Sequence, residues 1–363
     1  MKIGITLDMS IAFWANGMQQ NIVFLYSLLK SVGNQCLYIT QKKPAYYLSK
    51  KHEGILLMDL LADEKESLDT LIIAGFDLLP EMYEVLKRRN PNMKIILLHL
   101  GNKLMDDIHY SICNPDSKRT PLERPKHLDQ IWISPHHENA KNYLKSYYNF
   151  ENIITAPYIW DPFFIQQKIK ELDAKKLSPL FSEDKVKKVC IFEPNISSIK
   201  NCIIPMSICE RFEQKFDEKI ESINVFCCER VRQKKYFYKY MERLTVVKNR
   251  KCFFNNRWGS LDALSKFGST IISHQINNEL NYSYLENIYM GLPLIHNSPA
   301  FQDQGYYYEE FDSEMGANQL YNAIKNHELV KKEYLQHSRD FCKKFSPYLI
   351  ENKNAYMGIL NGT

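Results

Sequence analysis

The chain has 363 residues, of which 45% are hydrophobic and 25% are charged, and its formal net charge is +5. These values are typical of a folded protein of about two domains, and they exclude wholesale disorder. The N-terminal stretch lacks the long apolar run of a signal peptide, and no apolar run is long enough to span a bilayer. We therefore expect a cytoplasmic protein, located in the host cytoplasm if the chain is viral.

Short β-branched runs and amphipathic helices alternate through the first half of the chain. Residues 2–6 predict a strand, residues 18–32 a helix with one apolar face, and residues 36–40 a second strand. The alternation continues with further strands at 71–74, 94–99 and 130–134, and with a helix at 81–88. This pattern predicts a parallel sheet with helices on both faces.

A second alternation follows the proline-containing stretch 157–162, which suits a linker. We expect strands at 186–192, 223–227, 251–254, 270–273 and 293–296, and helices at 166–176, 205–216, 261–266, 282–289, 316–325 and 329–345. The predicted fold class is therefore α/β, with two Rossmann-like, doubly wound domains whose ligand-binding edges face each other across a cleft. We assign residues 1–160 to the first domain and residues 161–345 to the second, with the tail 346–363 packing back on the first.

The most informative segment covers residues 273–299. It predicts a helix that carries Glu286, then the turn Gly291-Leu292-Pro293 and an apolar strand. A carboxylate on such a helix can accept hydrogen bonds from the ribose hydroxyls of a nucleotide, and the helix N-terminus offers N–H groups to its pyrophosphate. The alternative is a surface acid followed by an ordinary turn.

Seven stretches carry a resemblance through most of the chain. They are FWANGMQQNIVFLYSLL (13–29), HLGN (99–102), SPHHEN (134–139), YIWDP (158–162), FEPNISSIKNCIIPM (192–206), SHQINNELNYSYLENIYMGLPLIHNSP (273–299) and GYYYEEFD (305–312). On these stretches the chain resembles an uncharacterised bacterial family, a domain of unknown function found near surface-polysaccharide genes. That family is similar to GT-B glycosyltransferases of the retaining, GT4-like kind. The resemblance implies a GT-B fold, with the first domain on the acceptor side and the second binding a nucleotide sugar, and an activity that transfers a hexosyl or pentosyl group.

The chain departs from this family around Asn277, where the family usually carries an acid. Retaining enzymes often show two glutamates with seven residues between them. Here Glu279 and Glu286 have six residues between them, and Asn278 stands where the first glutamate would be. Glu279 is a candidate catalytic residue, and the choice between retention and inversion stays open.

Candidate donor-binding residues follow from the same resemblance. GT-B relatives place a basic pair after the first strand of the second domain, and Lys200 matches its second member. The first member is absent, and Arg257 is a candidate replacement. A cation here would neutralise the leaving diphosphate, whereas the alternative is a solvated lysine. Asn195 in the same loop and Asn287 beside Glu286 are assigned to the donor as well.

Asn16 and Gly17 open the first helix of the N-terminal half. Glycine allows the backbone to approach a phosphate or a sugar closely. In GT-B relatives this loop faces the donor, so both residues are candidate donor-binding residues. The alternative is a plain turn capped by Asn16.

Histidines near strand ends are the remaining candidates. His99 and Asn102 end one strand and His274 ends another, and a histidine there can shuttle a proton or bind a hydroxyl. We take His99 and His274 as catalytic candidates and Asn102 as an acceptor-binding one, although strand-end histidines are often structural. His136, within SPHHE, is assigned to the acceptor because adjacent residues rarely ligate one metal ion.

Several motifs are missing from the sequence. It contains no HExxH, GxGxxG, P-loop or GxSxG motif, which argues against zinc proteases, P-loop NTPases and lipase-type hydrolases. It also lacks the Asp-x-Asp motif that holds the metal of the other large transferase fold. We therefore expect an enzyme without a metal or a further cofactor, with the nucleotide sugar as its co-substrate.

The sequence leaves more than one candidate for the acceptor. Residues 230–251 hold nine Lys/Arg and one acid with interleaved aromatic residues, and we assign Lys234 and Lys235 to the acceptor. A glycan or polysaccharide is the preferred acceptor. One alternative is a phage-type DNA glycosyltransferase that modifies hydroxymethylated bases, since basic and aromatic residues can grip nucleic acid. Further alternatives are a solvated helix face and a non-catalytic module that binds sugar nucleotides.

Overall fold

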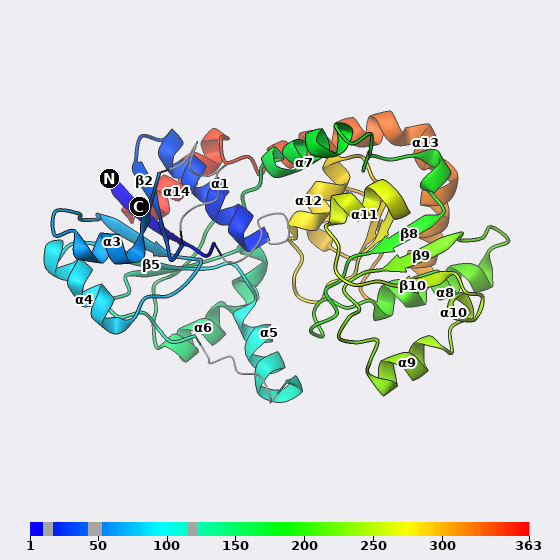
Figure 1. Ribbon diagram of the computed structural model, residues 1–363, viewed down its shortest axis with the longest axis horizontal. Helices are drawn as coiled ribbons and strands as arrows, with labels where there is room; N and C mark the ends of the chain where they lie inside the picture. Colours follow the sequence, from blue (N-terminus) through cyan, green and yellow to red (C-terminus); the bar gives the residue numbers. More distant parts are fainter. Residues whose placement is uncertain (10–16, 43–52, 115–121, 363) are drawn as a thin grey trace. The chain divides into compact units, whose positions relative to one another are not determined.

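The chain forms two compact units in a computed structural model that describes residues 1–9, 17–42, 53–114 and 122–362 (Figure 1). Unit 1 comprises Met1–Asp161 together with Lys344–Thr363, and unit 2 comprises Pro162–Lys343. Unit 2 is thus inserted into the sequence of unit 1. Within the described ranges, no helix is long and apolar enough to cross a membrane.

Unit 1 is built on a parallel sheet with the strand order β3-β2-β1-β4-β5-β6-β7. Its strands are β1 (Lys2–Leu7), β2 (Gln35–Thr40), β3 (Gly54–Leu56), β4 (Thr70–Ile73), β5 (Lys94–His99), β6 (Gln130–Ile133) and β7 (Ile153–Thr155). Its helices are α1 (Gly17–Ser31), α3 (Leu57–Ala62), α4 (Pro80–Arg89), α5 (Lys103–Ile108), α6 (Lys141–Tyr148) and α14 (Ile350–Asn361), with a π-helical turn His109–Cys113 and a 3₁₀ helix Pro135–Ala140.

Helices cover both faces of this sheet. Side chains of α3, α4 and α6 pack on one face, where Leu71, Ile95 and Ile131 are buried. Helices α1 and α14 lie on the other face (Figure 1). Burial on both faces explains why these strands read as continuous apolar runs rather than as alternating ones.

The C-terminal helix α14 is anchored to unit 1 by hydrogen bonds. The Tyr356 hydroxyl donates to the Pro157 carbonyl at 2.8 Å, and the Tyr356 ring contacts that of Trp132. Just before the helix, the Trp160 N–H donates to the Phe345 carbonyl at 2.7 Å. The chain therefore leaves unit 1 and returns to it at neighbouring positions.

Unit 2 is built on a second parallel sheet with the order β10-β9-β8-β11-β12-β13. Its strands are β8 (Lys188–Ile191), β9 (Ser222–Val225), β10 (Cys252–Phe254), β11 (Thr270–Ile272), β12 (Leu294–His296) and β13 (Tyr306–Tyr307). Its helices are α7 (Phe163–Asp173), α8 (Ile203–Lys215), α9 (Lys235–Met241), α10 (Thr245–Lys248), α11 (Ser260–Phe267), α12 (Tyr282–Tyr289) and α13 (Ser313–Lys343). Helix α8 and the first half of α13 pack on one face, and α11 and α12 cover the other (Figure 1).

The predicted doubly wound α/β class is confirmed, and most expected elements are within two or three residues of the observed ones. The two helices expected at 316–325 and 329–345 are wrong, because α13 runs unbroken over 31 residues. The residues between them, 326–328, contain neither Gly nor Pro. His327 is buried there and bonds Tyr306 and the Gly291 carbonyl, which holds the middle of the helix against the sheet.

Candidate functional site

The strand order of unit 2 reverses between β8 and β11, which are neighbours in the sheet but not in the sequence. Glu193 follows β8 by two residues, and Ser273 and His274 come directly after β11. Glu193 Oε1 accepts a hydrogen bond from the Ser273 hydroxyl and another from the His274 N–H at 3.3 Å. This carboxylate therefore joins two loops at the position where open α/β sheets bind ligands.

The environment of Glu193 changes its acidity. The side chain is only 3% exposed, and this burial raises its pKa to about 7. The Ser273 hydroxyl, the nearby Lys200 charge and the His274 N–H act in the opposite direction. Glu193 is therefore poised between its neutral and its charged form near neutral pH.

Two further contacts join the same loops. Lys200 and Gln275 form an isolated antiparallel bridge, and the Ile276 N–H donates to the Ile199 carbonyl at 3.0 Å. Lys200, a predicted donor-binding residue, is partly exposed on this loop. The bridge brings Lys200 to the loop after β11, which also carries His274 and Glu279.

His274 is enclosed rather than open to solvent. Its side chain is 1% exposed, and burial lowers its pKa to about 4, so the imidazole is neutral at pH 7. His274 Nδ1 lies 2.9 Å from the Tyr308 hydroxyl, which itself donates to the Ser273 carbonyl at 3.4 Å. These contacts assign the proton to Nδ1. Nε2 is then a buried acceptor, and no hydrogen-bond partner for it occurs in the described part of the chain.

The loop between β11 and α12 is hydrogen-bonded to the two residues that directly follow β12. The Gln275 N–H donates to Asn297 Oδ1 at 3.0 Å, and Asn297 Nδ2 donates back to the Gln275 carbonyl at 2.9 Å. Ser298 Oγ donates to the Glu279 carbonyl at 2.7 Å. The Glu279 side chain remains exposed on this fixed loop.

Helix α12 follows and carries the predicted pair Glu286 and Asn287, as the sequence pattern indicated. Asn281 caps its N-terminus by accepting from the Ser283 N–H at 3.0 Å. Glu286 is partly exposed, whereas Asn287 is buried and donates to Ser283 Oγ at 3.3 Å. Asn287 therefore braces the first turn of the helix, and Glu286 is the more accessible of the two.

Asn195, a predicted donor-binding residue, has a side chain that bonds to the surrounding backbone. Its Nδ2 donates to the Glu193 and Phe226 carbonyls at 2.8 and 3.1 Å, and its Oδ1 accepts from the Cys202 N–H at 2.8 Å. Its φ of +55° lies in the left-handed region that Asn tolerates better than most residues. Asn195 thus shapes the loop that carries Lys200.

The remaining donor candidates lie in different places. Arg257 is exposed on the loop after β10, at the same edge of the unit 2 sheet as Lys200. Gly17 begins α1 of unit 1. Asn16 lies outside the described residues.

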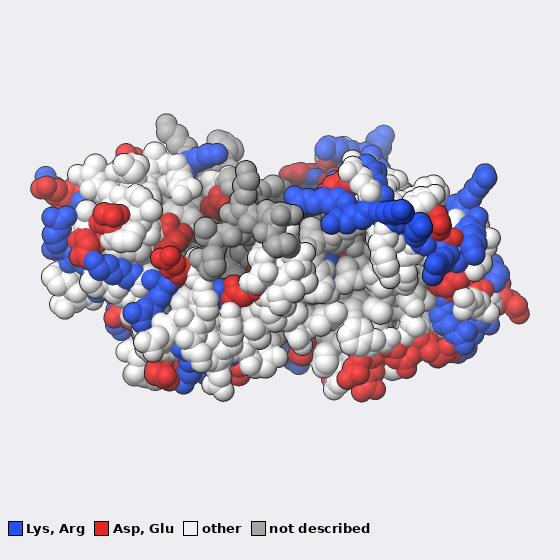
Figure 2. Space-filling view, turned by 90° about the horizontal axis from the view of Figure 1, so that it is seen from below, with Lys and Arg blue, Asp and Glu red and all other residues white. Residues whose placement is uncertain are grey.

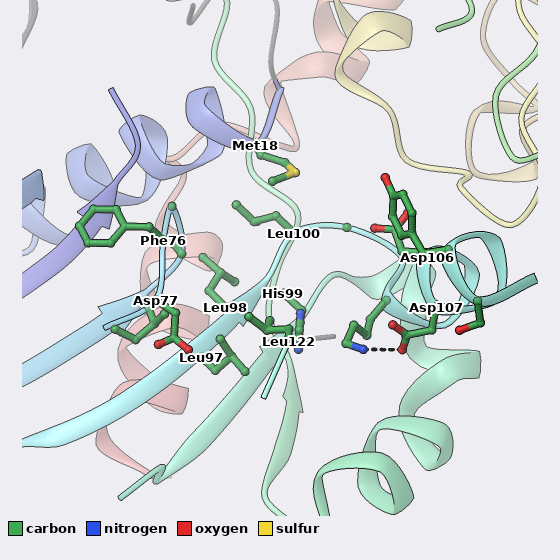
Figure 3. A pocket seen from close by; sticks show the side chains of 17 residues that line it. Met18, Phe76, Asp77, Leu97, Leu98, His99, Leu100, Asp106, Asp107 and Leu122 are labelled. Carbon is green, nitrogen blue, oxygen red and sulfur yellow. Dashed lines mark hydrogen bonds and ion pairs between the residues drawn. The ribbon is translucent and has the colours of Figure 1, made fainter. Parts of the chain in front are cut away.

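Unit 1 contains a cavity of about 350 Å³ at the carboxyl ends of β4 and β5 (Figure 3). Its wall combines apolar with polar side chains: Met18, Phe76, Leu97, Leu98, Leu100 and Leu122, with Asp77, His99, Lys103, Asp106, Asp107 and Tyr110. A cavity of this size and mixed lining is typical of small-molecule sites. It lies beside the position where the strand order of unit 1 reverses, between β1 and β4.

Gly75 lets the loop after β4 pass close to the end of β1. A Cβ atom on Gly75 would lie 2.5 Å from the Asp8 backbone nitrogen and 2.9 Å from the Thr6 carbonyl oxygen. The Thr6 hydroxyl accepts from the Ala74 and Gly75 N–H groups at 2.8 and 3.1 Å. This close approach sets one rim of the cavity.

The opposite rim is formed by α5 and the π-helical turn His109–Cys113, a rare geometry that is frequent at functional sites. Asp107 accepts hydrogen bonds from the Lys103 ammonium and the Tyr143 hydroxyl. In Figure 3, Asp106 and Asp107 lie on the same side of the cavity. With Asp77, three carboxylates and one ammonium line this space, which makes it acidic.

His99, a predicted catalytic residue, lines the cavity. Its Nε2 lies 2.9 Å from the Tyr148 hydroxyl. Burial, the Lys103 charge and His137 lower its pKa to about 4, so it is neutral at pH 7. The geometry thus offers a neutral imidazole beside acidic groups.

The predicted acceptor residues are divided between the two units. Asn102 caps α5 by accepting from the Met105 N–H at 3.1 Å and is not in the cavity wall. His136 lies on the 3₁₀ helix, with its ring 3.9 Å from that of His137. Lys234 and Lys235 are exposed at the start of α9 and belong to unit 2.

Several residues of these sites were not assigned from the sequence, among them Glu193, Tyr308, Asp106 and Asp107. Glu193 and Tyr308 do lie in stretches that carry the family resemblance. Their partners are about 80 and 34 residues away in the sequence, so spacing could not reveal the contacts. As for metals, the described residues hold no group of three or more His, Cys, Asp or Glu side chains placed to bind an ion.

Residues 3–360 match the model of a family described as "Protein of unknown function (DUF2827)". The chain belongs to this family. No curated protein sequence matches the chain significantly. The match over nearly the whole chain confirms the family resemblance seen in the sequence.

Solved structures similar to this DUF2827 chain include a HepE from Anabaena in complex with UDP-glucose, with 9% identity, a TM-score of 0.56 and full coverage of both chains. A TarM variant from S. aureus with fondaparinux, alpha-GlcNAc-glycerol and UDP has 9% identity, a TM-score of 0.63 and 99% coverage of both. An alpha-glucosyltransferase with UDP and DNA containing a HMU base has 11% identity and a TM-score of 0.57, covering 95% of this chain and 97% of its own. These likenesses confirm the predicted GT-B fold.

Proposed function

We propose that this DUF2827 protein is a nucleotide-sugar-dependent glycosyltransferase that transfers a sugar to a glycan acceptor. The observation that carries the proposal is the polar cluster of unit 2, in which Glu193 joins the loops of β8 and β11 at the reversal of strand order. Such positions bind nucleotides in doubly wound sheets. Structures of the same fold in complex with UDP or UDP-glucose support a nucleotide sugar as the donor.

In this proposal, unit 2 binds the donor. Lys200 and Arg257 neutralise the diphosphate, and the capped N-terminus of α12 contributes its N–H groups. Glu286, partly exposed on α12, accepts hydrogen bonds from the ribose hydroxyls. Because these groups replace a metal ion as the partner of the leaving phosphate, the reaction proceeds without one. We further propose retention of configuration, with Glu279 on the donor side.

The cavity of unit 1 binds the acceptor. Its carboxylates accept hydrogen bonds from sugar hydroxyls, while its apolar wall contacts the ring. His99 is neutral and adds an uncharged imidazole to this wall, which can hydrogen-bond an acceptor hydroxyl. The acidic lining favours an acceptor group without negative charge. Nucleic acid, the second candidate acceptor, is supported by the exposed cations at Lys234 and Lys235.

A screen of nucleotide sugars against the full chain tests this function. Calorimetry measures donor binding, and release of the nucleoside diphosphate with and without glycan acceptors measures turnover. We expect one donor to bind and acceptor-dependent release to follow. Binding without any turnover would indicate the non-catalytic module, and failure of every donor to bind would overturn the proposal.

A further inference from the structure

Eight exposed cations without acidic partners in the described chain lie on α9, on α10 and in the loops beside them in unit 2. We call this group the basic surface, and its members are Arg230, Arg232, Lys234, Lys235, Lys239, Arg243, Lys248 and Arg250. All eight are exposed, and none forms an ion pair with any residue that the structure describes. Figure 2, seen from the side of α9, shows Lys and Arg side chains gathered in a band across this part of unit 2.

Elsewhere in unit 2, lysines are commonly paired with acids. Lys187 and Lys325 both contact Glu218, and Lys215 contacts Glu314. Even Lys251, directly after the basic surface, pairs with Glu213. The basic surface instead gathers eight unpaired cations within residues 230–250, where Glu242 is the one acid among residues 230–251.

Two tyrosines project from the same surface. Tyr236 is 84% exposed and Tyr238 is 63% exposed, whereas Phe237 and Met241 of the same helix pack into the core. The inner face of α9 is thus fixed, and the outer face presents rings among cations. Within residues 229–251, no large aliphatic side chain is exposed in the structure as described. This composition suits a polar polymer better than an apolar partner.

The charges select the class of polymer. Unpaired cations attract a polyanion, and arginine forks match carboxylate and phosphate groups. Exposed tyrosine rings can pack against the apolar faces of sugar rings or of bases. An acidic glycan and a nucleic acid both meet these requirements.

The glycan acceptor of the proposed function decides between them, so this step rests on the proposed function. The cavity lined by Asp77, Asp106 and Asp107 favours an uncharged acceptor group. A glycan can end in an uncharged sugar and carry acidic sugars further along. We infer that the basic surface binds a carboxylate-bearing glycan chain, the polymer to which the acceptor end belongs.

Fluorescence anisotropy with a labelled oligomer of polygalacturonic acid tests the inference on the full chain. We expect binding that weakens with salt, and no binding of uncharged dextran. The triple variant Lys234→Gln, Lys235→Gln, Lys239→Gln should bind about tenfold more weakly. Its salt slope, which is the slope of the logarithm of the binding constant against the logarithm of salt concentration, should be smaller in magnitude by up to about three. The matched control changes Lys170, Lys175 and Lys176, which are exposed lysines of unit 2 outside the surface, and should bind like the wild type.

A second variant, Tyr236→Ser with Tyr238→Ser, should weaken binding without altering the salt slope, because no charge is removed. Unchanged binding in the lysine triple variant would overturn the inference. So would a DNA oligonucleotide of equal charge that binds more tightly than the polyuronate and loses that binding in the triple variant. Donor binding, measured separately by calorimetry, should be the same in all these variants. A chain that binds the polyuronate but no nucleotide sugar would contradict the proposed function and not this inference.

Discussion

The Glu193 carboxylate accepts a hydrogen bond from the Ser273 hydroxyl, although the two residues lie 80 positions apart in the sequence. The contact joins the loops after β8 and β11, and both groups are buried. A carboxylate in that position must remain partly desolvated whether or not it is charged. This conflict between burial and ionisation has a measurable consequence for stability.

Glu193→Gln should change the pH dependence of stability. Burial raises the pKa of Glu193 from 4.5 to about 7, so the unfolded chain loses this proton at lower pH than the folded chain. The contribution of Glu193 to the free energy of folding is therefore constant below about pH 4.5. It becomes increasingly unfavourable as the pH rises to about 7. Since one pKa unit corresponds to 1.36 kcal/mol, the free energy of unfolding falls by about 3 kcal/mol over this pH range because of Glu193.

Urea unfolding at pH 5 and pH 8 measures this effect. The wild-type chain should lose more stability between the two values than the Gln variant, which has no carboxyl to ionise at this position. Equal losses in both proteins would show that Glu193 titrates normally. Glu221→Gln, at an exposed acid of the same unit, serves as the control.

Lys200→Ala should weaken binding of both the nucleoside diphosphate and the intact nucleotide sugar. The expected loss is about 1–3 kcal/mol, because the diphosphate is common to both ligands. Calorimetry with each ligand measures it, and Lys176→Ala provides an exposed-lysine control. Normal binding of the diphosphate by the variant would indicate that Arg257, and not Lys200, neutralises the diphosphate.

Glu286→Gln and Glu279→Gln should separate binding from catalysis. If Glu286 holds the ribose, its variant should lose about 1–3 kcal/mol of affinity for the nucleotide as well as for the donor. Glu279→Gln should leave nucleotide affinity unchanged and lower turnover. Calorimetry and turnover assays distinguish these outcomes. Loss of nucleotide affinity in the Glu279 variant, with normal affinity in the Glu286 variant, would exchange the two assignments.

Asp106→Asn should raise the KM for the acceptor and leave donor affinity unchanged, because Asp106 lines the cavity of unit 1 only. The loss of one charge-assisted hydrogen bond corresponds to about 1.5–3 kcal/mol, or roughly a tenfold or greater increase in KM. Glu84→Gln, on α4 outside the cavity wall, is the control. A changed donor affinity with a normal acceptor KM would contradict the acceptor assignment.

Transfer should survive chelation. In the proposed function, Lys200, Arg257 and the N-terminus of α12 stabilise the leaving phosphate without a metal ion. Turnover measured in EDTA should therefore equal turnover in buffer. Complete loss in EDTA, followed by recovery with magnesium or manganese, would require a metal site.

The sequence predicted the elements with strong local patterns and missed those without them. Residues 94–99 and 282–289 were located correctly, because a buried apolar run and a helical period each extend over several residues. Strands β3 and β13 have only three and two residues, too few for any periodicity. Among the candidate sites, the side-chain role of Asn195 could not be read from sequence, because it depends on carbonyls that only the folded loop brings together.

The hydrogen bond between the Trp160 N–H and the Phe345 carbonyl marks where the chain departs from unit 1 and where it comes back. All of Pro162–Lys343 is therefore synthesised before α14, whose Tyr356 and Leu360 are fully buried in unit 1. The unit that emerges first is completed last. Until α14 has been synthesised, the surface of the unit 1 sheet that α14 covers stays exposed. We therefore expect chaperones to bind nascent chains chiefly at unit 1.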